Sequence, residues 1–312
     1  MIATNFWPVR LDERRFPVAR RLYETEPGVR VLVEEQRPGT EPRGDIVMVH
    51  GLEGSSAARY MKSMARAALE SGYAAHRLNL RSCGGTAEHC RTGYHSGLTS
   101  DLLCVLRRIS AASGRAAYVA GFSLGGNVAL KLAGELGEGA EGILGGVVAV
   151  SAPIDLAASV DAIERRRNWL YHSRFLRRLK SRASAIARKN PGLVPPETIA
   201  RVSGIREFDD TITAPMFGFR GAAEYYATQS ASCFLDAIRV PALLIHAKDD
   251  PVVPFEIFER LAGADHPFVR LLALEHGGHM GFIERNSRNF WTDDAVIEWI
   301  EGLRETAAHG VR

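Results

Sequence analysis

The sequence predicts an α/β fold in which a mostly parallel central sheet is flanked by helices, with a helical lid inserted after the sixth strand. Short apolar runs alternate with segments of helical periodicity, which is typical of a parallel sheet covered on both faces. The alternation stops after residue 152 and resumes at residue 240. The chain has 312 residues, 46% hydrophobic and 24% charged, as expected for a folded protein with a large core.

The first half of the chain supplies six of the predicted strands. Residues 18–36 form two extended runs joined by a Pro27-Gly28 turn, which predicts an antiparallel hairpin. Four short apolar runs predict buried strands at residues 46–51, 74–80, 116–123 and 146–153. Apolar residues that recur every three or four positions predict the intervening helices at residues 59–71, 97–112 and 124–136.

The interruption predicts the domain organisation. Residues 1–152 form the first part of the core, residues 153–239 form a helical lid or cap, and residues 240–312 complete the core. In the last part, apolar runs at 241–250 and 268–278 restore the strand pattern, and a periodic segment at 293–304 predicts a closing helix.

Several functional classes are disfavoured by composition. The net charge of +3 is too small to indicate nucleic-acid binding. Neither an uninterrupted apolar stretch of signal-peptide type near the N-terminus nor a run of 18 apolar residues occurs, so we expect a protein that is neither exported nor membrane-spanning. Its cysteines, Cys83, Cys90, Cys104 and Cys233, lack metal-site spacing. We therefore expect reduced thiols and a cytoplasmic location.

Residues 164–189 have an unusual charge. This segment contains ten Lys or Arg and one acid, a net charge of +9, which leaves −6 for the rest of the chain. Leu176, Leu179, Ala183 and Ile186 recur at helical spacing, which predicts a basic amphipathic helix or helix pair. One interpretation is a solvated outer face over a buried stripe. The other is attraction to an acidic substrate or to anionic lipid, with a peripheral membrane contact through residues 164–189.

The strongest chemical signal is the motif Gly121-Phe122-Ser123-Leu124-Gly125, which lies between a predicted strand and a predicted helix. A G-x-S-x-G motif in this context is a sharp turn that exposes its serine at the carboxyl end of the sheet. Glycine is needed there because larger side chains would collide with neighbouring backbone. The motif predicts Ser123 as a nucleophile, with the Leu124 N–H at the helix N-terminus as an oxyanion donor.

A serine nucleophile needs a histidine base that a carboxylate orients. Asp249 and Asp250 follow one predicted strand, and His276 and His279 lie after the next. The order Ser, Asp, His is that of α/β-hydrolases. Asp250 is favoured because Val-Pro follows it after two residues, which leaves Asp249 a surface role. His279 is favoured because two glycines free the loop to present it, which leaves His276 a structural role.

The loop after the strand that ends at His50 is expected to supply a second oxyanion donor. The backbone N–H of Leu52 is favoured, with the N–H of Glu53 as the near alternative. His50 itself is more consistent with a residue that fixes this loop by hydrogen bonding than with a catalytic group.

The chain resembles the α/β-hydrolase family that contains bacterial YheT-type hydrolases, plant EMB8-type proteins, and eukaryotic ABHD1/ABHD3-type and alcohol acyltransferase relatives. The matching segments are HGLEGSSAARY (50–60), NLRSCGGT (79–86), GFSLGGN (121–127), FDDTITAPMFGFRGAAEYY (208–226), AKDDPVVP (247–254) and HGGHMGF (276–282). Most α/β-hydrolases lack the segment 208–226. Family members often have glycine at the position of Ser82, and we interpret Arg81 and Cys83 as loop-shaping residues.

A mechanism on Ser123, Asp250 and His279, with Leu52 and Leu124 as oxyanion donors, needs no metal or organic cofactor. The resemblance implies this same triad. It implies a serine esterase, and we expect short- to medium-chain esters as its substrates. An alcohol O-acyltransferase or a phospholipid or lipid-ester hydrolase would use the same residues, and a non-catalytic binding protein is a further alternative. Aromatic residues of the lid form its core or line an apolar pocket: Phe175, Phe217, Phe219, Tyr225 and Tyr226.

Overall fold

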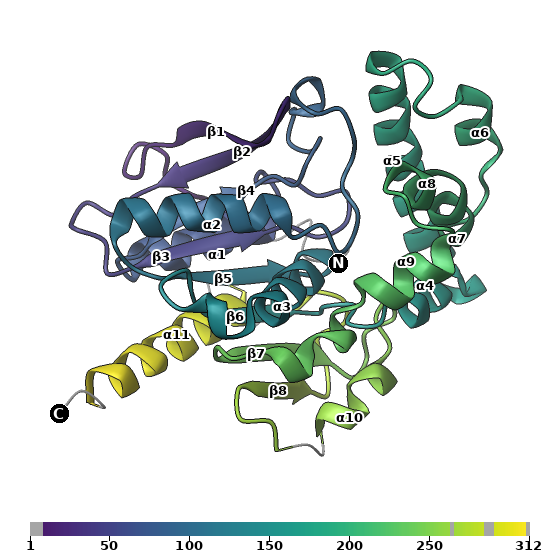
Figure 1. Cartoon of the computed structure of the whole chain (residues 1–312). Coiled ribbons are helices and arrows are strands. Elements are labelled where there is room, and N and C mark those ends of the chain that lie inside the picture. The colour runs from purple at the N-terminus through teal and green to yellow at the C-terminus, as the bar shows by residue number, and fades with distance from the viewer. Residues whose placement is uncertain (1–8, 263–264, 284–289, 310–312) are drawn as a thin grey trace.

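Eight strands form one sheet in the computed structural model, which describes residues 9–262, 265–283 and 290–309 (Figure 1). The order of the strands across the sheet is β1-β2-β4-β3-β5-β6-β7-β8. The strands are β1 (Ala19–Glu26), β2 (Val29–Gln36), β3 (Asp45–Val49), β4 (Ala74–Leu78), β5 (Ala117–Phe122), β6 (Leu144–Val150), β7 (Ala242–Ala247) and β8 (Val269–Leu274).

The predicted antiparallel hairpin is confirmed. β1 pairs antiparallel with β2, with Leu22 opposite Leu32, and Gly28 adopts a positive φ of 76° in the connecting turn. β2 also pairs antiparallel with β4. The remaining neighbours, from β4 through β3, β5, β6 and β7 to β8, are parallel. The carboxyl ends of these six parallel strands therefore meet at one edge of the sheet.

Six α-helices and a π-helical turn, together with three of the 3₁₀ turns given below, lie between β6 and β7 and form what we call the insertion. The α-helices and the π-helical turn are α4 (Leu156–Glu164), α5 (Trp169–Lys189), α6 (Pro196–Arg201), α7 (Ile205–Phe208), the π-helical turn (Asp209–Thr213), α8 (Ala214–Met216) and α9 (Ala222–Gln229). Figure 1 shows them together beside the sheet, at the end to which β5 and β7 point. The remaining short helices are α10 (Glu259–Ala262) and 3₁₀ turns at Ala87–His89, Gly137–Ala140, Arg166–Asn168, Ala231–Cys233, Leu235–Ala237 and Phe255–Phe258.

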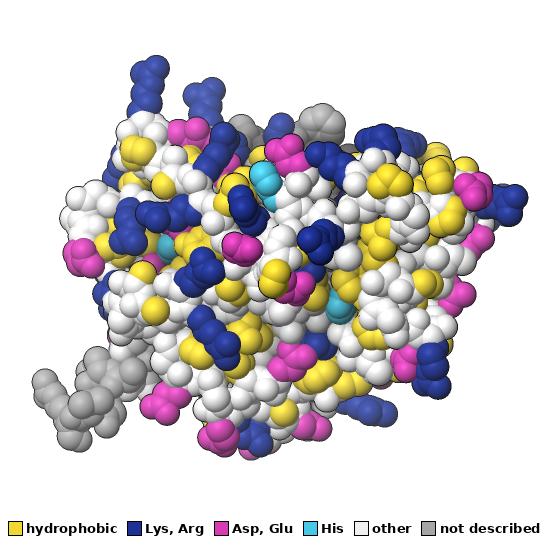
Figure 2. Space-filling model, turned by 45° about the horizontal axis from the view of Figure 1, so that its top comes forward, with side chains coloured by type: hydrophobic (Ala, Val, Ile, Leu, Met, Phe, Trp, Pro, Cys, Tyr) yellow, Lys and Arg dark blue, Asp and Glu magenta, His cyan; other side chains and the backbone are white. Residues whose placement is uncertain are grey.

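The basic segment forms one long helix, α5, preceded by a 3₁₀ turn. Its buried stripe consists of Phe175, Leu179, Ala183 and Ile186, whereas Leu176 is only partly buried. The predicted stripe includes Leu176, which is partly buried and packs against the same core. Phe175, four residues before Leu179, is the more deeply buried residue of this turn. Figure 2 shows Lys and Arg side chains spread over the face of the molecule that it displays.

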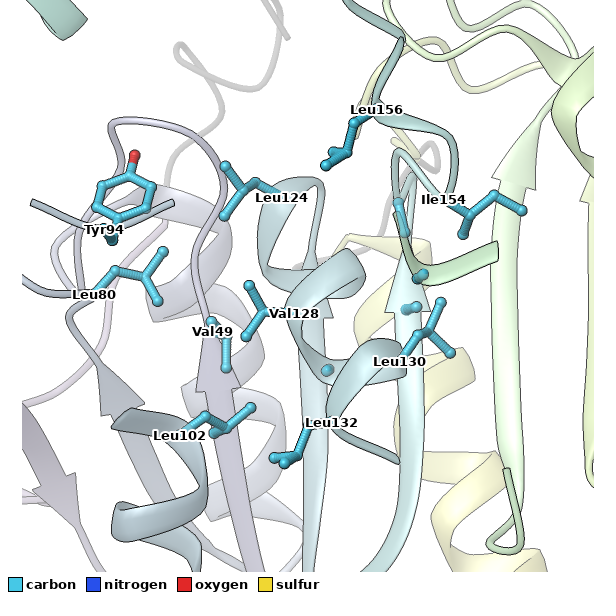
Figure 3. Close-up of a cluster of buried hydrophobic side chains, with 14 of the residues drawn as sticks. Val49, Leu80, Tyr94, Leu102, Leu124, Val128, Leu130, Leu132, Ile154 and Leu156 are labelled. Atoms are coloured by element: carbon cyan, nitrogen blue, oxygen red, sulfur yellow. The ribbon is translucent and has the colours of Figure 1, made fainter. Parts of the chain in front are cut away.

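Helices cover both faces of the sheet, and the side chains of β3 alternate between two apolar cores. Ile46 and Met48 pack with α1 (Arg59–Glu70) and α11 (Trp291–His309) on one face. Val49 packs on the other face with α2 (Ser100–Ser113) and α3 (Leu124–Leu136), as Figure 3 shows for Leu102 and Val128. Strands β3, β4, β5, β6 and β7 are buried along almost their whole length, which explains why they read as apolar runs in the sequence.

Some predicted boundaries were wrong by a few residues. Helix α2 begins at Ser100 and not at residue 97. A side chain at position 97 would meet Gln229 of the insertion at 2.4 Å, and the Ser96 N–H donates to the Tyr225 hydroxyl. These long-range contacts hold the start of the segment as a loop. In the described ranges, no helix is both long and apolar enough to cross a bilayer.

Candidate active site

Three of the predicted residues meet at the carboxyl edge of the sheet. Ser123 follows β5, Asp250 follows β7 and His279 follows β8. His279 Nε2 lies 3.0 Å from Ser123 Oγ, and His279 Nδ1 lies 2.8 Å from Asp250 Oδ2. All three residues are buried. A hydroxyl, an imidazole and a carboxylate are thus in contact in the order that base-assisted nucleophilic attack requires.

The turn that holds Ser123 is strained, with φ 51° and ψ −122°. The Ser123 N–H donates to Val150 O at 2.8 Å, which ties the turn to β6. A Cβ atom at Gly121 would lie 2.4 Å from the carbonyl oxygen of Gly125, and one at Gly125 would lie 2.2 Å from the carbonyl oxygen of Val49. Both glycines of the motif are therefore required by close backbone approach.

Asp250 is held as a carboxylate that faces His279. Its Oδ1 accepts the N–H groups of Val252 and Val253 at 2.8 and 3.0 Å, and its Oδ2 faces the imidazole. Burial by itself raises the pKa of Asp250. The charge of His279 and these hydrogen bonds outweigh burial, so the pKa lies below its usual value.

Asp249 and His276 lie outside this constellation. Asp249 Oδ1 accepts the N–H groups of Gly277 and Gly278 at 2.9 and 2.7 Å, and so shapes the loop that carries His279. The His276 side chain is 90% exposed and lies 3.4 Å from Asp249 Oδ2. The pair belongs to the surface of the loop.

The two predicted oxyanion donors lie beside Ser123. Leu52 and Leu124 line the same pocket as the serine, and the described part of the chain provides no hydrogen-bond acceptor for either N–H. The alternative donor, the Glu53 N–H, already donates to the hydroxyl of Tyr94 at 2.7 Å. This leaves the N–H groups of Leu52 and Leu124 as the candidate pair.

His50 fixes the loop after β3, as expected. It is fully buried, its Nε2 accepts the Leu80 N–H at 3.1 Å, and its Nδ1 donates to the carbonyl oxygen of Gly51 at 2.8 Å. Burial lowers the pKa of His50 to about 4, so the ring is neutral. Both ring nitrogens are occupied by this structural role.

Arg81 and Cys83 shape the neighbouring loop. The Arg81 guanidinium donates to Asp101 of α2 at 2.7 Å and to Glu26 of β1 at 2.8 Å. Cys83 is buried, and burial raises the pKa of its thiol to about 12. A thiol with this pKa is not ionised at neutral pH and is unsuited to be the nucleophile.

Two hollows meet at Ser123. The first, the apolar pocket, holds about 690 Å³ of empty space, open solvent included, between the sheet edge and the insertion. The second, the polar hollow, holds about 1190 Å³ of empty space, open solvent included, and is lined by His279 and three arginines. Ser123, Leu52 and Phe175 line both hollows. Apolar residues that line the first include Leu124, Pro153, Leu156, Val160, Ile163, Leu179, Ile205, Val252 and Val253.

The segment 208–226 closes the apolar pocket from the insertion side. Asp209 lies in its wall and accepts hydrogen bonds from the hydroxyls of Thr213 and Tyr226 at 2.8 and 2.7 Å. Burial raises the pKa of Asp209 to about 6 despite these bonds. Tyr225 and Tyr226 also line this pocket.

Not every predicted aromatic residue lies in the pocket wall. Phe175, Tyr225 and Tyr226 do, whereas Phe217 and Phe219 do not. Those two pack edge-on against His95, with ring centroids 4.6 and 5.5 Å away. They form part of the packing that supports the pocket.

Sequence reasoning missed one functional contact. Arg182 of α5 pairs with Glu53, and Nε lies 2.6 Å from Oε1. A signal was available, because Arg182 lies three residues after Leu179 and four before Ile186, on the buried stripe of α5. A cation at such a position requires a buried partner.

The sequence profile of the alpha/beta hydrolase family matches residues 46–290. The chain belongs to this family. It is 34% identical over 260 residues to the presumed esterase YheT of Escherichia coli (strain K12), which covers 82% of this chain and 76% of YheT. It is 29% identical over 244 residues to phospholipase ABHD3 of Mus musculus, with 78% of this chain and 59% of that protein covered.

A third relative is the medium-chain fatty acid ethyl ester synthase/esterase 2 of Saccharomyces cerevisiae (strain ATCC 204508 / S288c). The two are 28% identical over 294 residues, with 83% of this chain and 62% of the yeast protein covered. The chain thus spans about three fifths of the length of these two eukaryotic relatives. The predicted resemblance to the YheT and ABHD3 group is confirmed.

Solved structures confirm the fold. The Pyrococcus furiosus esterase Pf2001 superposes with a TM-score of 0.61 at 17% identity, over 95% of this chain and 94% of that one. The sheet order, the parallel strands and the flanking helices are those of an α/β-hydrolase. The family match and the relatives named esterase and phospholipase support a hydrolase of this fold.

Proposed function

We propose that the protein is a serine carboxylic ester hydrolase that forms an acyl-enzyme on Ser123. The observation that carries this proposal is the Ser123, His279 and Asp250 contact at 3.0 and 2.8 Å, beside an apolar pocket. Relatives named esterase and phospholipase support it.

In the first half of the reaction, Ser123 Oγ attacks the ester carbonyl carbon while its proton passes to His279 Nε2. The carbonyl oxygen becomes an anion that accepts hydrogen bonds from the N–H groups of Leu124 and Leu52. The bond between carbon and the alcohol oxygen then breaks, and His279 Nε2 returns its proton to the departing alkoxide. The products are the free alcohol and the acyl-enzyme.

Water completes the cycle by the same steps. His279 Nε2 takes a proton from water, the hydroxide oxygen attacks the acyl carbon, and the proton then passes to Ser123 Oγ as the carboxylic acid leaves. Asp250 accepts the hydrogen bond of His279 Nδ1–H throughout. This contact fixes the tautomer and stabilises the imidazolium.

We propose residues 153–239 as the lid of this site and short- to medium-chain esters as its substrates. The apolar pocket lies between Ser123 and the insertion, and its walls include Leu156, Val160 and Phe175. An acyl chain matches such walls better than a polar group does.

A chain-length series of p-nitrophenyl esters, from acetate to palmitate, tests this function. Wild-type protein is compared with Ser123→Ala and with Ser232→Ala, an exposed serine away from the site. We expect Ser123→Ala to lose several orders of magnitude in kcat, and Ser232→Ala to match wild type. Undiminished turnover in Ser123→Ala would overturn the proposal. A fluorophosphonate probe that fails to label Ser123 would favour the non-catalytic alternative.

Acyl transfer to an alcohol is the second candidate. The yeast relative is named both as an ethyl ester synthase and as an esterase, and the same residues serve both reactions because an alcohol can replace water in the second half. Product analysis with added ethanol separates them: predominant ethyl ester would favour transfer, and free acid alone would favour hydrolysis.

We also propose a peripheral membrane contact, which would suit lipid-ester substrates. The apolar stripe of α5 is buried, so it cannot insert into a bilayer. Trp169 and Leu170 at the start of α5 are 61% and 54% exposed, and they follow the exposed Arg165, Arg166 and Arg167. Exposed apolar residues beside basic ones suit an anionic membrane surface.

A further inference from the structure

The polar hollow carries positive charge that the proposed triad does not use. Arg174 and Arg178 line it from α5, one helical turn apart, together with Arg59 from α1. Among the described residues that line it, Glu53 supplies the carboxylate. That carboxylate is already bound by Arg182 at 2.6 Å and by the Tyr94 hydroxyl at 3.0 Å. The negative charge of Glu53 is therefore neutralised by Arg182, which does not line the hollow.

Arg174 and Arg178 lack a carboxylate partner in the described part of the chain. Arg178 donates one N–H to the carbonyl oxygen of Glu53 at 3.1 Å, which leaves its other N–H groups available. Arg174 is partly buried, and both its burial and the charge of Arg178 lower its pKa. Two like charges one turn apart repel each other, and a bound anion would relieve that repulsion.

The position of His279 indicates which part of an ester enters this hollow. His279 lines the polar hollow but not the apolar pocket. In the proposed reaction, His279 Nε2 returns a proton to the alcohol oxygen, so the alcohol part of the substrate lies on the side of His279. The acyl chain is then directed into the apolar pocket.

We propose that the polar hollow binds an anionic group, a phosphate or a carboxylate, on the alcohol part of the ester, through Arg174 and Arg178. This inference rests on the proposed function and specifies its substrate class. Guanidinium groups suit the task because their planar N–H donors match the oxygens of phosphate and carboxylate.

The test compares esters that share one acyl chain. The substrates are 1-octanoylglycerol, its 3-phosphate, and the octanoyl ester of 3-hydroxypropanoate. They are assayed with wild type, with the double variant Arg174→Gln and Arg178→Gln, and with Arg177→Gln. Arg177 is the matched control, since it is an exposed arginine of α5 outside the hollow.

We expect wild type to have a higher kcat/KM for an anionic ester than for the neutral one. The ratio of the two should fall about 10- to 100-fold in the double variant, as for the loss of charge-assisted hydrogen bonds, and stay within about twofold in Arg177→Gln. A preference for the phosphate or for the carboxylate ester identifies the anion. A ratio that is the same in wild type and in the double variant would overturn the inference and leave the ester hydrolase intact.

A second measurement covers the case in which none of these esters is hydrolysed. Fluorophosphonate labelling of Ser123 is followed in the presence of glycerol 3-phosphate or glycerol. Protection by glycerol 3-phosphate in wild type that disappears in the double variant supports the inference, and equal labelling rates contradict it. Failure of wild type to be labelled at all would contradict the proposed function itself.

Discussion

Glu53, in the loop after β3, and Arg182, in α5, form an ion pair whose Nε and Oε1 atoms are 2.6 Å apart and whose side chains are 7% and 12% exposed. Glu53 is the neighbour of Leu52, a candidate oxyanion donor, and Arg182 belongs to the insertion. The Arg182 guanidinium also lies 4.3 Å from the centre of the Tyr94 ring, and the Tyr94 hydroxyl accepts the Glu53 N–H. The ion pair therefore couples the position of the insertion to the orientation of the loop.

Arg182→Met should lower the free energy of unfolding by roughly 3 kcal/mol, because it leaves the Glu53 carboxylate buried without its cation. Glu53→Gln combined with Arg182→Met should cost less than the sum of the single changes, since no unpaired charge remains. Urea unfolding gives the free energy of unfolding of Arg182→Met, of Glu53→Gln and of the double variant. Arg177→Met, at an exposed position, is the control. Additive losses would show that the two side chains are not energetically coupled.

Asp250→Asn should reduce kcat about 10³- to 10⁴-fold, because an amide cannot stabilise the imidazolium and favours the wrong tautomer of His279. Asp249→Asn should change kcat only a few-fold, since its amide oxygen can still accept the N–H groups of Gly277 and Gly278. Steady-state kinetics on a p-nitrophenyl ester compares the two variants. A larger loss in Asp249→Asn would transfer the role of the acid to that residue.

Asp293 should make the protein less stable as the pH rises from about 4 to above 7. It is fully buried and accepts hydrogen bonds from the Ser63 hydroxyl at 2.5 Å and the Phe290 N–H at 3.1 Å. Burial raises its pKa to about 7, whereas an unfolded Asp has a pKa of about 3.9. The native state therefore binds the proton more tightly, and the stability from this group is lost as the pH rises through about 7.

Comparison of wild type with Asp293→Asn isolates this contribution. Urea unfolding of both proteins at pH 5 and pH 8 gives four free energies of unfolding. The loss between the two pH values should be larger for wild type, by an amount on the order of 1 to 3 kcal/mol, since Asn does not titrate. An equal loss in both proteins would contradict the assignment.

Trp169→Ser together with Leu170→Ser should weaken binding to vesicles that contain anionic phospholipid, because the variant lacks the apolar residues that enter the interface. Vesicle co-sedimentation measures the effect, and hydrolysis of a water-soluble ester checks that the site is intact. Leu22→Ser is the control, because Leu22 is also exposed but lies on β1. Equal binding by all three proteins, or no binding by wild type to anionic vesicles, would eliminate the proposed contact.

The sequence predicted those elements whose signals are local. The hairpin follows from its Pro27-Gly28 turn, and the buried strands follow from short apolar runs. The sequence pattern did not predict features that depend on contacts between distant parts of the chain. The start of α2 is set by contacts with α9. On α5, Phe175 is more deeply buried than Leu176 because of how the helix is rotated against the core.

By itself, the sequence determined the α/β-hydrolase fold and the sharp turn at Ser123, because the glycine-flanked serine lies between a strand pattern and a helix pattern. The requirement for Gly121 is local, since its Cβ would meet the carbonyl oxygen of Gly125, whereas that for Gly125 comes from the neighbouring strand β3. Tertiary structure decided which of two adjacent aspartates faces the imidazole, since neighbouring side chains differ in direction and not in chemistry. It also decided that Arg182, out of ten basic residues in one segment, turns inward to Glu53. The two paired residues are 129 positions apart in the sequence. A local sequence pattern therefore cannot predict which carboxylate pairs with the buried arginine.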